Sequence, residues 1–121
     1  MAYDVPGMTS EKNQGNLGDG PLVTMMDATS IAHDGFRKHI KEVAEAHHIP
    51  VQWATTPGGG TDAGSIHVAN EGIPTITIGV PLRYMHSNVS VMHTDDYENS
   101  VQLITEIVRS LNDDSYQSLM W

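Results

Sequence analysis

Three short apolar runs separate the polar segments of this chain and predict its strands. They cover residues 22–26, 51–55 and 73–80, and the last run is the richest in β-branched residues. Pro81 ends that run because proline cannot donate a sheet hydrogen bond. Apolar positions at helical spacing lie between and after the runs. This alternation of strand and helix predicts an α/β fold with a mainly parallel sheet and helices on its faces.

Two longer amphipathic stretches predict helices. The first runs from Asp34, as N-cap, to about His48, and Pro50 cannot continue it. The second begins with Asp95 as N-cap and has Glu98 three residues later, the spacing of a capping box. Each helix has one apolar stripe that is expected to face the core: Phe36, Ile40, Val43, Ala44 and His47 in the first, and Tyr97, Val101, Ile104, Val108 and Leu111 in the second.

The other segments complete the predicted order of elements. A shorter helix at about 61–70 ends at Gly72, which suits the left-handed position after a helix. Residues 1–20 are rich in Gly, Asn, Asp, Ser and Pro and predict a loop or an arm. Three strands make a thin sheet for an α/β domain, so the predicted fold is incomplete.

Composition narrows the classes of partner. The chain has 121 residues, which corresponds to one domain, and a formal charge of −9, which argues against nucleic acid and anionic membranes. It contains no cysteine, so disulfides and thiolate metal sites are excluded. No apolar run approaches the roughly 20 residues that span a bilayer. The first residues also lack the basic region and apolar core of a signal peptide, so we expect a cytoplasmic protein.

His86 is the leading candidate site residue. It lies six residues after Val80, in a loop that follows the predicted end of the last strand. Such loops carry the chemistry of many α/β proteins, and imidazole is a common ligand for Zn and Co. One histidine cannot hold a catalytic metal, because such sites have about three protein ligands. A structural or solvated histidine is therefore the alternative.

A glycine-rich turn at Gly58, Gly59, Gly60, Thr61 and Asp62 is the second candidate. Its backbone amides could bind an anion or an oxyanion at a helix start, and its glycines would let a substrate come close. The alternative is a tight strand-to-helix turn with Thr61 as N-cap. Asp62 is either a helix-start carboxylate or a group that supports a metal ligand. Together with the His86 loop, this turn is expected to form one wall of a metal-dependent site.

The remaining polar residues favour structural explanations. Arg83 could bind a carboxylate or a partner, although a lone arginine is usually a surface charge. No serine or cysteine nucleophile can be argued for. The acidic residues of the last helix read as caps and a solvated face: Asp95, Asp96, Glu98 and Glu106. The other histidines form no metal-binding pattern: His33, His39, His47, His48, His67 and His93.

Several segments resemble, in this order, those of the glutamyl (tetrahedral) aminopeptidases. They are Asp4–Gly7, Leu17–Pro21, Gly58–His67, Gly72–Pro74, Arg83–Ser87 and Asp96–Asn99, and they cover essentially the whole chain. The family consists of cytoplasmic di-metal exopeptidases, some of which have an old cellulase M or endoglucanase label. The resemblance implies a zinc-exopeptidase-like, three-layer α/β/α sandwich, two Zn or Co ions, peptide substrates and a homo-oligomeric parent.

The family motif Arg-Tyr-x-His-Ser matches Arg83, Tyr84, Met85, His86 and Ser87, so the resemblance implies that His86 is a metal ligand. It also implies that the glycine turn lies near the substrate. In the family, the metal-activated water attacks the peptide carbonyl with a glutamate as general base.

The family's other ligands and its general base lie upstream of the Asp-x-Pro-Gly segment, and Asp4 matches that segment rather than a ligand. Residues 1–121 are therefore expected to be the C-terminal part of a catalytic domain, with no catalytic residue of their own and no activity alone. Three alternatives are a non-enzymatic assembly module, a domain that dimerises through exposed sheet edges, and, less favoured, a glycoside hydrolase, for which no convincing carboxylate pair is present.

Overall fold

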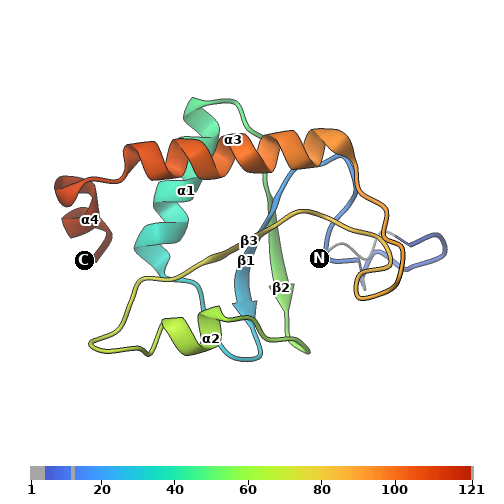
Figure 1. The fold of residues 1–121 in the computed structure, drawn as a ribbon, viewed down its shortest axis with the longest axis horizontal. Coiled ribbons are helices and arrows are strands. Elements are labelled where there is room, and N and C mark those ends of the chain that lie inside the picture. Colours follow the sequence, from blue (N-terminus) through green and yellow to red (C-terminus); the bar gives the residue numbers. More distant parts are fainter. Residues whose placement is uncertain (1–4, 12, 121) are drawn as a thin grey trace.

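The computed structural model describes residues 5–11 and 13–120, which form a small sheet with four helices (Figure 1). The strands are β1 (Leu22–Asp27), β2 (Gln52–Thr56) and β3 (Thr77–Gly79), and the helices are α1 (Asp34–Ala46), α2 (Ala63–Ile66), α3 (Thr94–Ser110) and α4 (Asp113–Met120). The predicted α/β class is confirmed, and each predicted strand and helix has a counterpart. None of the helices in this described part is long and apolar enough to cross a membrane.

The sheet is mixed rather than mainly parallel. Its strand order is β2-β1-β3, with β1 parallel to β2 and antiparallel to β3. Between parallel β1 and β2, helix α1 carries the chain back along the sheet, as a crossover must. Between β2 and β3 the only helix is the four-residue α2, which is too short for that return. β3 therefore starts at the end of the sheet where β2 stops, and it runs in the opposite direction (Figure 1).

β3 and α2 are both shorter than predicted. The apolar run at 73–80 forms a ladder only over Thr77–Gly79, because β1 pairs with it only through Leu22, Val23 and Thr24. The helix predicted at 61–70 reduces to Ala63–Ile66. Gly72 does adopt a left-handed backbone, with φ +93°. It does so in a turn after the end of α2, where the Gly72 N–H donates to the Ala69 carbonyl oxygen at 2.9 Å.

Histidines, rather than aspartates, cap the two long helices. His33 Nδ1 accepts the Phe36 N–H at 3.3 Å, while Asp34 lies inside the first turn of α1. His93 Nδ1 likewise accepts the Asp95 N–H at 3.1 Å and caps α3. Assigning the N-caps to Asp34 and Asp95 was therefore wrong by one and two residues, because the Nδ1 of a histidine can accept the same orphan N–H as an aspartate oxygen.

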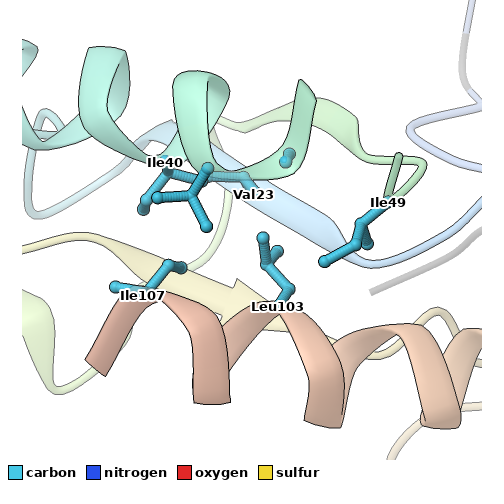
Figure 2. Packing of buried hydrophobic residues seen from close by; sticks show 7 residues of the cluster. Val23, Ile40, Ile49, Leu103 and Ile107 are labelled. Atoms are coloured by element: carbon cyan, nitrogen blue, oxygen red, sulfur yellow. The ribbon is translucent and has the colours of Figure 1, made fainter. Parts of the chain in front are cut away.

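The main core lies where α1 and α3 cover one face of the sheet (Figure 2). Its buried members come from β1, α1, the segment after α1, and α3: Val23, Ile40, Val43, Ala44, Ile49, Leu103 and Ile107. On the other face, a smaller cluster joins Leu22 and Ala54 to the partly buried Leu17. One helical layer of the expected sandwich is therefore present, and the structure is a partial α/β domain.

The apolar stripe of α3 does not face this core, contrary to the sequence prediction. We name it the apolar flank, defined as Tyr97, Val101, Ile104, Val108 and Leu111; their exposed fractions run from 38% to 64%. The buried row of α3 is instead Asp96, Ser100, Leu103 and Ile107. That row has the same helical spacing as the apolar flank. A search for apolar positions misses it because it contains the carboxylate of Asp96.

Asp96 holds the segment that precedes β1. It was expected to be a helix cap or part of a solvated face, but its exposed fraction is 0%. Its carboxylate accepts the N–H groups of Gly18 at 2.8 Å and Gly20 at 2.9 Å. Gln52 adds contacts from β2, accepting the Asn16 N–H and donating to the Gly20 carbonyl oxygen, each at 2.9 Å. Of the predicted 1–20 arm, the part before β1 is therefore tied to the sheet, and residues 1–4 and 12 lie outside the described residues.

Candidate functional site

The loop that carries His86 is closed by a pair of backbone hydrogen bonds. The Arg83 N–H donates to the Val91 carbonyl oxygen at 2.9 Å, and the Val91 N–H donates back to Arg83 at 3.2 Å. His86 is exposed within this loop, Tyr84 is half exposed, and Arg83 is partly buried at its base. The His86 imidazole is therefore exposed on a loop whose two ends are joined by backbone hydrogen bonds.

Two residues of this loop have a backbone conformation that side chains other than glycine rarely adopt. Tyr84 has φ +59° and His86 has φ +61°. Serine hydroxyls stabilise this shape, because Ser87 and Ser90 both hydrogen-bond the carbonyl oxygen of Tyr84, Ser90 at 3.1 Å. Such left-handed residues persist where the surroundings impose them, and they concentrate at functional sites. The sequence pattern gave no sign of these two φ values.

The glycine turn packs against the turn that follows β1. A Cβ on Gly60 would lie 2.8 Å from the Thr29 methyl carbon, and a Cβ on Gly64 would lie 2.4 Å from the Thr29 hydroxyl oxygen. The Gly59 carbonyl oxygen also accepts the Ala28 N–H at 2.8 Å. Contact with Thr29 is thus one physical reason for glycine at these positions, whereas Gly58 faces open space. Asp62 is exposed and makes no side-chain cap hydrogen bond.

Asp27, at the end of β1, fixes this arrangement. Its Oδ1 accepts the N–H groups of Thr29 at 2.7 Å and Ser30 at 2.9 Å, and its Oδ2 accepts the Thr61 hydroxyl at 3.1 Å. Hydrogen bonds from the Thr29 backbone and hydroxyl, helped by Thr61 and Ser30, lower the pKa of Asp27 from 3.8 to about 2. Asp62 rather than Thr61 stands at the N-cap position of α2, and the Thr61 hydroxyl donates to Asp27 instead.

The glycine turn and the His86 loop follow two strands that run in opposite directions. The turn follows the carboxyl end of β2, and the His86 loop follows the carboxyl end of β3. Since β2 is parallel to β1 and β3 is antiparallel to it, these two ends point in opposite directions. His86 lies seven residues beyond the end of β3, so strand direction alone does not place it, and the prediction that both segments form one wall of a single site stays a prediction.

The histidines other than His86 mostly have structural contacts. His33 and His93 cap helices; His39 bonds the Ser110 hydroxyl at 2.7 Å, His47 lies 3.5 Å from Glu106, and His67 bonds the Ala63 carbonyl oxygen at 2.7 Å. Over residues 5–11 and 13–120, no group of three or more His, Cys, Asp or Glu side chains could hold a metal ion. A catalytic zinc has about three protein ligands. These residues therefore do not fit a complete metal site, and His86 could supply one ligand of it.

Comparison with known proteins places this framework in a family. The family model of the M42 glutamyl aminopeptidases matches residues 1–103. The chain belongs to this family. Curated relatives include a putative aminopeptidase of Acetivibrio thermocellus, 38% identical over 108 residues, covering 89% of this chain and 32% of the relative. Another is the glutamyl aminopeptidase of Lactococcus lactis subsp. cremoris, 34% identical over 100 residues, covering 83% of this chain and 28% of the relative.

Solved structures agree with this assignment. A TET aminopeptidase from a marine-sediment archaeon of the Thaumarchaeota has a TM-score of 0.94 at 32% identity, over 98% of this chain and 33% of that one. The Pyrococcus horikoshii TET1 peptidase, which can assemble into a tetrahedron or a large octahedral shell, has a TM-score of 0.72 at 32% identity, over 80% of this chain and 28% of that one. The resemblance seen in the sequence is confirmed, and the chain spans about a third of the length of these relatives.

Proposed function

We propose that this chain supplies the His86 ligand to a metal-dependent aminopeptidase domain that needs further polypeptide to be complete. Family membership supports the activity class, and the closed, serine-braced loop supports a positioned imidazole. We also propose, as the family resemblance implies, that Gly58, Gly59, Gly60 and Asp62 of the glycine turn lie near the substrate. Arg83 and Tyr84 act here by shaping the loop: Arg83 closes its base, and the Tyr84 carbonyl oxygen receives the two serine hydroxyls.

The proposed substrate is the N-terminal residue of a peptide. Relatives are named glutamyl and lysyl aminopeptidases, so the family does not act on one residue type alone. The metals in this proposal are Zn or Co, as expected for the family, and one imidazole is too few to bind either as a catalytic centre. No chemical step is therefore assigned to the residues of this chain, and the chain alone is proposed to be inactive.

Activity measured with and without a complementing polypeptide tests this function. The chain alone, with Zn or Co, should release no amino acid from peptide amides. Co-expression with the part of the Acetivibrio thermocellus relative outside the aligned third should restore release. His86→Ala should abolish the restored activity, and His47→Ala, at an exposed histidine in the α1–α3 contact, should retain it. Metal-dependent release by the chain alone, lost in His86→Ala, would contradict the proposal.

Three further expectations belong to the completed protein. We propose that it forms a homo-oligomer, because the P. horikoshii TET1 peptidase assembles into closed shells. We also propose that it acts in the cytoplasm, which fraction-specific immunodetection of the native protein would check. Glycoside hydrolysis is not favoured, since it uses two carboxylates that flank the bond, and residues 83–91 around His86 contain no Asp or Glu.

A further inference from the structure

All three strands have one of their ends at the same end of the sheet. β1 and β2 finish there, and β3 begins there because it runs antiparallel to β1 (Figure 1). The Thr61 hydroxyl donates to Asp27 Oδ2 at 3.1 Å, and its oxygen lies 3.2 Å from the Thr77 hydroxyl of β3. A hydroxyl has one hydrogen, so Thr77 is the donor to Thr61. Asp27, at the end of β1, is therefore bonded to the glycine turn after β2 and, through Thr61, to β3.

The turn that follows β1 also contacts the glycine turn directly. The Ala28 N–H donates to the Gly59 carbonyl oxygen at 2.8 Å. The Thr29 side chain fills the space beside Gly60, where a Cβ would lie 2.8 Å from the Thr29 methyl carbon. Asp27 in turn holds Thr29, because its Oδ1 accepts the Thr29 N–H at 2.7 Å and the Thr29 hydroxyl at 2.8 Å. The Asp27 carboxylate thus fixes the glycine turn by a second route, through Thr29.

The glycine turn has backbone N–H groups that the described residues do not use. Gly58 and Gly60 are exposed, and among residues 5–11 and 13–120 their N–H groups have no hydrogen-bond partner. Exposed backbone N–H groups can bind the carbonyl oxygens of an extended peptide. Since no hydrogen bond of their own holds these two groups in place, their direction depends on the contacts around the turn.

We propose that Asp27 is a positioning residue for substrate binding, whose carboxylate acts through Thr61 and Thr29 to hold the glycine turn in the shape that binds a peptide. The inference rests on the proposed function, in which this turn lies near the substrate. Asp27 is buried, and its hydrogen bonds lower its pKa to about 2, so it is a charged acceptor throughout the neutral range. Asp27 itself does not touch the substrate, and its effect passes through the turn.

Steady-state kinetics of the complemented enzyme measures this effect, with tripeptides that begin with Glu or Lys, the residue types named in two relatives. Asp27→Ala removes the acceptor, and Thr61→Val removes the linking hydroxyl at nearly the same size. A misplaced turn weakens binding of the substrate and of the transition state alike. KM should therefore rise by about tenfold, the effect of losing about one hydrogen bond, while kcat changes by less than about twofold. Thr61→Ser keeps the hydroxyl and should restore the KM of the unchanged chain.

Asp96→Asn is the control for a loss of stability. It also weakens a buried carboxylate that accepts two backbone N–H groups, but these belong to the segment before β1. It should lower the melting temperature and leave KM unchanged. Amide hydrogen exchange of the chain alone gives a second readout: exchange of the Ala28 N–H, which bonds Gly59, should speed up in Asp27→Ala and Thr61→Val but not in Asp96→Asn.

The outcomes separate this inference from the proposed function. A higher KM in Asp27→Ala and Thr61→Val, restored in Thr61→Ser and absent in Asp96→Asn, supports the positioning role in variants that circular dichroism shows to be folded. In an active pair, an equal rise in Asp96→Asn, an unchanged KM in Thr61→Val, a fall in kcat alone or unchanged exchange at Ala28 would overturn the positioning role only. An unchanged pair without activity would overturn the proposed function, and the positioning role with it.

Discussion

Replacing the buried Asp96 carboxylate with an amide tests the largest departure from the sequence prediction. In the folded chain Asp96 accepts two backbone N–H groups, from Gly18 at 2.8 Å and Gly20 at 2.9 Å, and its exposed fraction is 0%. Asp96→Asn keeps the size but offers one acceptor, so an amide donor then faces one of the glycine N–H groups. Charge-assisted bonds contribute about 1.5–3 kcal/mol each, and a buried unpaired donor costs about 1–3 kcal/mol. We expect a loss of about 2–4 kcal/mol in the free energy of unfolding.

Asp95→Asn is the matched control for this measurement. It removes the same charge from the same helical turn, but the Asp95 side chain is 76% exposed and accepts no N–H from the segment before β1. Loss of its favourable position near the helix N-terminus should cost about 0.3–1 kcal/mol. Urea unfolding followed by circular dichroism gives both values, and hydrogen exchange should speed up at Gly18 and Gly20 only in Asp96→Asn. Equal effects of the two variants, within about 0.5 kcal/mol, would refute the reasoning.

Three other outcomes follow from the fold. Gly64→Ala should lower the free energy of unfolding by about 1–3 kcal/mol, because its Cβ would lie 2.4 Å from the Thr29 hydroxyl oxygen, while Gly58→Ala, which meets no atom within 4 Å, should change it by less than about 0.5 kcal/mol; urea titration compares them. The pKa of Asp27 is lowered to about 2, so the stability it contributes is complete above its ordinary value of 3.8 and is lost as the pH falls towards 2. The melting temperature should accordingly drop less between pH 4 and pH 2 in Asp27→Asn than in the unchanged chain, and parallel profiles would exclude the mechanism. Leu103→Ala, at a fully buried position in the main core, should cost about 2–5 kcal/mol in thermal or urea unfolding, whereas a loss below about 1 kcal/mol would place Leu103 outside the core.

Local sequence signals located the elements because they depend on few residues. The apolar runs and Pro50 bounded β1, β2 and α1 to within about two residues, which is the usual ambiguity of helix and strand ends. The caps were misassigned because His33 and His93 accept the same N–H groups as the neighbouring aspartates could. The family motif around His86 was recognised from its order of side chains, which is also a local property.

The direction of β3 could not be read in the same way. Strand direction depends on whether the connection returns along the sheet, and hence on the length of α2, which was overestimated. This one difference makes the carboxyl ends of β2 and β3 point in opposite directions. Proximity between distant segments is a property of topology, so neither motif could reveal it.

The sequence by itself determined the α/β class, the family and the His86 candidate, because each follows from periodicity or from a short ordered motif. Tertiary structure alone decided which side of α3 is buried. Two rows of equal spacing compete on that helix, one wholly apolar and one containing Asp96 and Ser100. The polar row is buried because Gly18 and Gly20 satisfy the Asp96 carboxylate, and these partners lie almost eighty residues away, 78 and 76 positions earlier in the chain. The wholly apolar row, which the sequence pattern predicts to face the core, is exposed instead.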